Sequence, residues 1–540
     1  MSAKPVDFSL PGLSPKAAPE FTDPATAKAW LEHVPLANVA TAQQQLLAQL
    51  EEFNRFAAKG VTRLAVLETL REAVNFVQIE HARRFTNRAL PMAEAESAAF
   101  AGTLELWEQT RLGYLRCLEA VSAGEIGMAD QGALVCQRLL AYSGLKMFHH
   151  YRAYRQVPAS DWQSLNQVYA EAERLGVAET MVKDYLNRDV QDASPRIQYM
   201  RATLIGMANP NEMSQRQLTF TAYLLERWAE KAEVASEPPE EGDAPPLVVD
   251  LEGTAPPERG VSIGREPRYL DLTRLAKSLR NRIGLLRKGE SPAKLALGED
   301  CVQPSCEQLL VFLYRQWCQA RPARGSERKR VSDVAQGCTD MAAVHYYISG
   351  RVFKQPGEQH ELTQEQRDQI ATFGRVSTRD EDDYSVVHGF LLEHWQLEDE
   401  SSQGLRMVRR AGNPGKRYLN GQLVGVKPAD SKNFFLGQVR WLMQNDAGDL
   451  YCGVRLLPGL PAATAVRPTG LNVQDAKYVQ ALSLTGVPAL NAAPSLVVPS
   501  GWFKPKRVVE VFVESPLRVR LTELLERGSD YERVAYEMVT

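Results

Sequence analysis

Residues 375–404 read RVSTRDEDDYSVVHGFLLEHWQLEDESSQG, and the expected architecture of the second half of the chain follows from this segment. Two arginines four residues apart begin it, and a strand-like run from His388 to Glu398 follows an acidic segment. An arginine guanidinium matches phosphate and the O6/N7 edge of guanine, and a carboxylate accepts hydrogen bonds from the opposite guanine edge. The residue types therefore indicate a site for a phosphodiester that carries guanine.

The expected ligand-binding residues are divided between a loop and the end of a strand. Asp399 and Ser401 are two residues apart, so they share one face of a strand that continues this far. A loop that carries Arg375 and Arg379 can then fold over that face. Ser401 offers a hydroxyl group, and Gly404 lets a ligand approach the backbone.

This arrangement resembles the PilZ domain, a bacterial receptor module for cyclic di-GMP. The family pattern is an RxxxR loop followed by [DN]xSxxG at a strand end, and both motifs occur here in that order. The resemblance covers residues 371–462 and implies an antiparallel β-barrel that binds cyclic di-GMP. It assigns the ligand contacts to Arg375, Arg379, Asp399, Ser401 and Gly404. Four further runs in this range read as strands, at 405–408, 418–426, 434–443 and 450–456.

The same residues also permit an interpretation without a ligand. Arg375 and Arg379 can pair with the acidic run at 380–383, and Asp399 can cap a turn. RxxxR alone is common, since it also occurs at Arg84 and elsewhere in this chain. The order of the two motifs and the strands that follow them favour the ligand site.

Composition limits the classes of function that we expect. The formal net charge is −3, so bulk charge does not favour nucleic-acid binding. Seven cysteines are scattered without a framework, which suits a reducing cytoplasm. Cys301 and Cys306 have the spacing of half a zinc site but lack a second pair, so no metal is expected. No run approaches the roughly 18 apolar residues of a transmembrane helix, and no signal peptide is recognisable.

The first half of the chain is predicted to be helical. Residues 1–21 are expected to form a disordered tail, and residues 22–234 show the apolar spacing of helices. Asp23 and Pro24 read as an N-cap followed by proline at the first helical position. The letters WQSLNQVY at 162–169 resemble the first helix of a tetratricopeptide repeat, although no second copy occurs at the repeat period. We expect an all-α domain that offers a surface to an unidentified protein partner.

The boundaries of the remaining segments follow from composition and pattern. Residues 235–262 are expected to form a linker, because Ser236–Gly260 holds six prolines and seven Asp or Glu residues. Residues 263–370 are expected to form helices and then scaffold strands, with Val344–Ile348 as a strand. Residues 463–540 are expected to form a β-rich extension beside the barrel.

The motifs present and missing predict a multidomain α plus β protein that binds a ligand and is not an enzyme. There is no P-loop, HExxH, GxSxG or GxGxxG motif, and no histidine in a general-base setting. We therefore expect a cytoplasmic cyclic di-GMP effector, without cofactor or metal, that relays the messenger level to a protein through residues 22–234. The alternative is a helical interaction scaffold or chaperone-like adaptor whose barrel no longer binds nucleotide.

Overall fold

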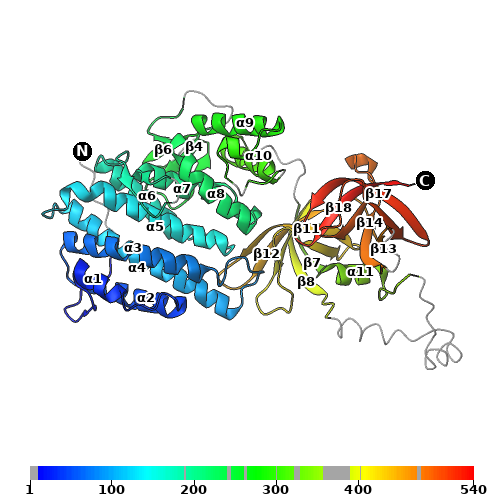
Figure 1. Cartoon of the computed structure of the whole chain (residues 1–540), viewed down its shortest axis with the longest axis horizontal. Coiled ribbons are helices and arrows are strands. Elements are labelled where there is room, and N and C mark those ends of the chain that lie inside the picture. Colours follow the sequence, from blue (N-terminus) through cyan, green and yellow to red (C-terminus); the bar gives the residue numbers. More distant parts are fainter. Residues whose placement is uncertain are drawn as a thin grey trace. The chain divides into compact units, whose positions relative to one another are not determined.

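The chain divides into two compact units, one helical and one built from β-barrels (Figure 1). The helical unit comprises Met1–Arg88 and Met92–Ala323, and the barrel unit comprises Ala89–Pro91 and Arg324–Thr540. This α plus β architecture confirms the predicted fold class. The computed structural model describes residues 10–187, 190–239, 245–260, 264–298, 301–303, 305–320, 329–356, 389–401, 403–470 and 476–539.

The helical unit has a continuous apolar core that extends from Phe21 to Trp317. Its first helix begins as predicted, because the Asp23 carboxylate accepts hydrogen bonds from the backbone N–H groups of Ala25 and Thr26. The helices are α1 (Pro24–Leu31), α2 (Val39–Arg55), α3 (Gly60–Ala82), α4 (Glu94–Ser122), α5 (Gly132–Arg152), α6 (Ala159–Arg174), α7 (Pro195–Met207), α8 (Gln215–Trp228), α9 (Thr273–Arg287) and α10 (Ser305–Cys318). The 3₁₀ turns are η1 (Ala129–Gln131), η2 (Pro210–Glu212), η3 (Ala229–Lys231) and η4 (Ala293–Leu295).

The segment predicted as a linker belongs instead to a small sheet of the helical unit. The strands are β1 (Val182–Lys183) and β2 (Asp192–Ala193), which form one hairpin, and β3 (Glu233–Ala235), β4 (Leu247–Asp250), β5 (Glu258–Arg259) and β6 (Pro267–Asp271), which form a sheet in the order β3-β6-β4-β5. Leu247 and Val249 of β4 are buried in the core of the unit. Their burial outweighs the flanking prolines and acidic residues, so the two compact units separate at residues 323 and 324, later in the chain than the predicted linker.

The described part of the predicted disordered tail, residues 10–21, is attached to the helical unit. Phe21 is buried, and its ring lies 5.3 Å from the ring of Trp30 and 5.4 Å from that of Phe53. The Ser14 N–H donates to the carbonyl oxygen of Arg55 at 2.8 Å. Aromatic packing of this kind fixes a segment that its proline content alone would leave free.

Two cysteines form a covalent pair that was not predicted from the sequence. Cys301 and Cys306 are joined by a disulfide at the start of α10. Their spacing therefore belongs to a covalent bond and not to half a zinc site. The free cysteines of the described chain are Cys117, Cys136, Cys318, Cys338 and Cys452.

The barrel unit contains two closed six-stranded antiparallel barrels (Figure 1). The first has the order β10-β11-β12-β9-β8-β7, with strands β7 (Lys329–Thr339), β8 (Glu393–Ser401), β9 (Gly404–Arg409), β10 (Leu423–Pro428), β11 (Phe435–Gln444) and β12 (Leu450–Leu456). The second has the order β13-β14-β15-β18-β17-β16, with strands β13 (Pro461–Pro468), β14 (Val479–Leu484), β15 (Ser495–Pro499), β16 (Val508–Phe512), β17 (Pro516–Arg527) and β18 (Tyr531–Met538) and the 3₁₀ turn η5 (Pro488–Leu490).

Two predictions for this half were wrong. Residues 344–348, predicted as a strand, lie in helix α11 (Met341–Ser349), which ends at Gly350 with a φ of 67°. The C-terminal extension closes into its own barrel and is not a companion layer for strands at 340–354. The strand that completes the first barrel is β7, which precedes the predicted boundary at residue 371.

Helix α11 lies in a core shared by both barrels. Val344 is fully buried in a cluster that also includes Leu423 and Leu436 of the first barrel and Leu482 and Val497 of the second. A polar contact also joins the two barrels. The N–H of Leu423 in β10 donates to the carboxylate of Asp530, which directly precedes β18, at 2.9 Å. The two barrels therefore share apolar and polar contacts within one compact unit.

A buried ion pair lies inside the first barrel. Arg409 Nη1 is 2.6 Å from Glu393 Oε2, and the two side chains are only 4% and 0% exposed. The Arg409 guanidinium lies 5.3 Å from the ring of Trp395 and 5.6 Å from that of Tyr418. Lys416 completes the network, since its N–H donates to Glu393 and its carbonyl oxygen accepts from Arg409. Both charges are thus fully provided with partners.

We predict that Arg409→Met destabilises the first barrel by about 3–5 kcal/mol, because Glu393 would keep a buried charge without its cation. The matched control is Arg410→Met, since Arg410 pairs with Asp449 but is 51% exposed. The control should have little effect on stability, because solvent screens an exposed ion pair. Hydrogen exchange of β8 and β9 in the full chain measures both effects. Equal losses in the two variants would contradict the importance of the buried pair.

Candidate ligand-binding site

The structure locates three of the five predicted ligand-binding residues at one junction of strands. Asp399 and Ser401 lie in β8, and Gly404 is the first residue of β9. Ser401 pairs with Gly404 across the two strands, and its hydroxyl donates to the Gly404 carbonyl oxygen at 3.2 Å. Arg375 and Arg379 lie outside the described residues.

A β-bulge between Leu397 and Asp399 determines which face of the barrel Asp399 occupies. Leu397 pairs with Met407, and both side chains are buried in the barrel. After the bulge, Asp399 pairs with Arg406. Neighbouring residues of β9 alternate faces and paired residues share a face, so Arg406 and Asp399 both lie on the outside. Without the bulge, regular spacing would keep Asp399 on the inner face with Leu397.

The outer face continues across β12 and β11. Gly453 of β12 pairs with Arg406, and Trp441 of β11 pairs with Gly453. Two residues further along both strands, and so on the same face, Arg455 pairs with Gly404. We call this surface the outer patch, and it consists of Asp399, Ser401, Gly404, Arg406, Trp441, Gly453 and Arg455.

The middle of the outer patch is aromatic. A Cβ atom placed on Gly453 would come within 1.9 Å of Trp441 Nε1, so the indole lies directly over the glycine backbone. The Arg406 guanidinium is 5.9 Å from the Trp441 ring and 5.7 Å from that of Tyr451. This arrangement groups two half-exposed rings and a cation, which suits a flat aromatic ligand.

Charged groups surround these rings. Arg406 Nε lies 2.8 Å from Glu398, and Arg455 Nη2 lies 2.5 Å from Glu526. Arg330 lies in β7, the strand beside β8, and pairs with Asp399 of β8. The outer patch thus brings guanidinium groups, one carboxylate and one hydroxyl to the edge of an aromatic surface. Such a set can hold an anion and also bind the polar edge of a ring.

Three residues of the outer patch, Arg406, Trp441 and Arg455, were not predicted from the sequence. Each lies within a run that was correctly read as a strand, but the runs give no information on pairing. Register across β9, β12 and β11 brings the three side chains together, and a second irregularity between Val439 and Trp441 sets where the indole lies. Only the strand pairing could have revealed them.

Other classes of site find no support in the described part of the chain. Within those ranges no group of three histidine, cysteine, aspartate or glutamate side chains is arranged to hold a metal ion. Nor does any helix there combine the length and the apolar character that crossing a bilayer requires. Among the described residues, the outer patch is therefore the candidate ligand site.

Two family models match the chain on either side of the first barrel. The model described as "Cyclic-di-GMP receptor FimW, N-terminal domain" matches residues 25–240. The model described as "FimW C-terminal beta-barrel domain" matches residues 464–539, which include nearly all of the second barrel. The protein named Cyclic-di-GMP receptor FimW in Pseudomonas aeruginosa is 24% identical to this chain over 545 residues, covering 88% of this chain and 84% of its own length. The similarity thus extends over most of both proteins.

Proposed function

We propose that this chain is a receptor for cyclic di-GMP and that the ligand binds on the outer patch of the first barrel in the manner of a PilZ domain. The main support is the register that aligns Asp399, Arg406, Gly453 and Trp441 across four strands. This row joins a carboxylate, a guanidinium and an aromatic ring, which are the groups that recognise a guanine nucleotide. The similarity to a protein named as a receptor for cyclic di-GMP supports the same ligand.

Each polar residue of the proposed site has a defined role. Asp399 accepts hydrogen bonds from the guanine N–H groups. Arg375 and Arg379, on the segment before β8, bind the phosphates and the O6/N7 edge. Ser401 adds a hydroxyl contact, and Gly404, which has no side chain, lets the ligand approach the backbone. The barrel itself also favours glycine there, because a Cβ would lie 2.9 Å from the Val454 carbonyl oxygen.

The aromatic residues supply the remaining binding energy. Trp441 and Tyr451 present rings on the same outer face, and a guanine base can stack on such a surface at about 1–3 kcal/mol per base. Arg406, which lies near both rings, can stack on the opposite face of the base. In this proposal binding, and not catalysis, is the task of the site.

The helical unit is the proposed output surface for a protein partner. Phe76 and Ile79 lie three residues apart on α3, so they share one face of the helix. Their exposed fractions are 45% and 47%, which is high for large apolar side chains. These two residues support an interaction role for the unit, and they are the first positions to substitute when a partner is sought.

We expect Arg375→Ala and Arg379→Ala each to weaken cyclic di-GMP binding by about 1–3 kcal/mol, because each removes a bidentate contact. Calorimetric titration of the purified full chain measures this. Arg84→Ala is the matched control, since it alters an RxxxR motif in the helical unit and should leave affinity unchanged. A wild-type chain that binds no cyclic di-GMP would refute the proposed function and favour the scaffold alternative. Wild-type affinity in the Arg375 variant would disprove the role of that arginine alone.

We expect Trp441→Ala to weaken the same binding by about 1–3 kcal/mol through the loss of base stacking. Trp502→Ala is the control, because Trp502 lies in the barrel unit with the guanidinium of Arg507 5.2 Å from its ring, outside the outer patch. Titration with cyclic di-GMP, after a check that both variants fold, gives the comparison. If the two tryptophan variants bind equally well, the stacking role of Trp441 is wrong.

A further inference from the structure

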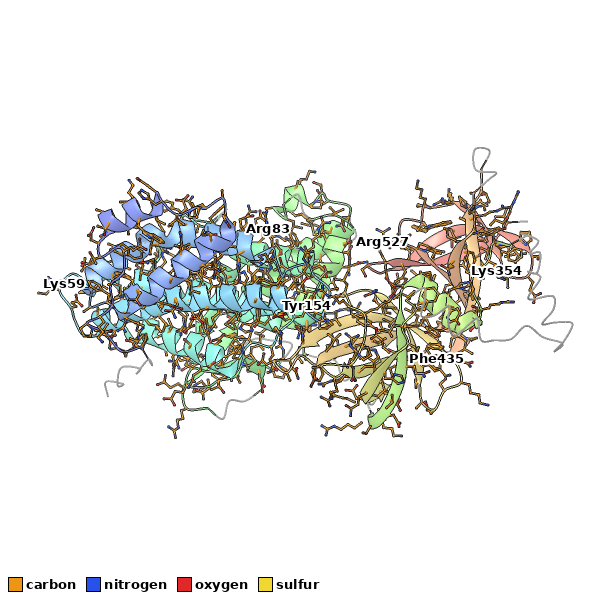
Figure 2. The ribbon with its side chains drawn as sticks, turned by 90° about the horizontal axis from the view of Figure 1, so that it is seen from below. Lys59, Arg83, Tyr154, Lys354, Phe435 and Arg527 are labelled. Carbon is orange, nitrogen blue, oxygen red and sulfur yellow. A yellow bond between two sulfur atoms is a disulfide. The ribbon has the colours of Figure 1, made fainter. Side chains whose placement is uncertain are left out.

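An ion pair connects the outer patch to the second barrel. Arg455 Nη2 of β12 lies 2.5 Å from Glu526 Oε2 of β17. The arginine side chain is 41% exposed, and the glutamate side chain is 12% exposed. Figure 2 labels Arg527, the neighbour of Glu526 and the last residue of β17. The guanidinium is therefore accessible to a ligand, while its carboxylate partner belongs to the other barrel.

Arg455 lies next to the strand end that carries the predicted ligand contacts. It pairs directly with Gly404, which in turn pairs with Ser401. Paired residues of an antiparallel sheet have Cα atoms about 4.5–5.5 Å apart, so the arginine side chain reaches the same surface as Ser401. The Arg455 guanidinium is also 3.4 Å from the Gln438 side-chain oxygen, which holds it on this side of the barrel.

We infer that Arg455 is a further phosphate-binding residue of the cyclic di-GMP site and that Glu526 competes with the ligand for it. This inference rests on the proposed function. Without ligand, the carboxylate of the second barrel neutralises Arg455. A bound phosphate takes over the guanidinium, because phosphate accepts the same charge-assisted hydrogen bonds as a carboxylate. Ligand affinity therefore depends on a residue of the second barrel, and ligand binding releases a contact of β17.

The surroundings of Glu526 allow this exchange. Tyr531 Oη donates to Glu526 Oε1 at 2.6 Å, so the carboxylate keeps a partner when Arg455 leaves. Arg533 is a second cation near Glu526. Burial lowers the pKa of Arg533, the charge of Glu526 raises it, and the charge of Arg455 lowers it. When Arg455 moves to the ligand, a positive charge leaves the surroundings of Arg533. Glu526 then remains to balance the charge of Arg533. The released carboxylate is not left buried without a partner.

The backbone of β17 is irregular at the same point. Its pairing with β18 shifts register between Leu524 and Glu526, as well as between Leu521 and Glu523. Bulges redirect side chains and interrupt the ladder of hydrogen bonds. A local change at Glu526 therefore acts on a segment that is not held by a regular ladder, which makes β17 the element of the second barrel that should respond to the ligand.

The test is a titration with cyclic di-GMP of the full chain and its variants. Glu526→Gln should bind about two- to fivefold more tightly, because the amide keeps the hydrogen bond from Tyr531 but no longer neutralises Arg455. Arg455→Gln should bind about fivefold or more weakly, because it removes a charge-assisted contact. Glu523→Gln is the matched control: it makes the same charge change at an exposed position of the same strand and should leave affinity unchanged.

The combination of variants separates the possible failures. In an Arg455→Gln background, Glu526→Gln should have no further effect, as expected for two residues that act on each other. If the wild-type chain binds cyclic di-GMP and the Glu526→Gln and Arg455→Gln chains bind it with the same affinity, this inference is wrong and the proposed function stands. A wild-type chain that does not bind overturns both. Hydrogen exchange of β17 in the wild-type and Arg455→Gln chains gives an independent reading: the ligand should change exchange only in the wild type, and an equal change in both overturns the inference.

Discussion

The β-bulge after Leu397 is the constraint on which the candidate site depends. It turns Asp399 outward while the preceding residues of β8 remain inside the barrel. The inner and outer faces of β8 and β9 therefore differ in their surroundings. Their inner face holds the buried pair of Glu393 and Arg409, and their outer face begins the outer patch. Because the inner pair is costly to disturb, it fixes the strands whose outer ends carry the proposed ligand contacts.

The second barrel makes direct contacts with the first barrel, which carries the candidate site. The two barrels share an apolar core around α11, and the turn that precedes β18 contributes Asp530 to the start of β10. Within that common body, the pair of Arg455 and Glu526 is the contact that a ligand on the outer patch would compete for. A rigid apolar core with a replaceable ionic contact at its surface is a physical basis for transmitting ligand occupancy from one barrel to the other.

Much of the barrel could be predicted from the sequence, because β9, β11 and β12 are apolar runs bounded by turn residues. Strand β7 was missed, since KRVSDVAQGCT carries many polar residues and only its last third is buried. Residues 344–348 were misread because aromatic and β-branched residues favour strands, whereas burial against two barrels selects a helix here. The motif gave Asp399, Ser401 and Gly404, but Trp441 and Arg455 depend on register and bulges, which no local pattern encodes.

Hydrogen exchange of the full chain with and without cyclic di-GMP tests the location of the site most directly. The ligand should slow exchange at 397–408 and 450–456, the strands that form the centre of the outer patch, and in the segment that carries Arg375 and Arg379. Slower exchange confined to the helical unit, with no change in β8, β9 or β12, would contradict a ligand site on the first barrel.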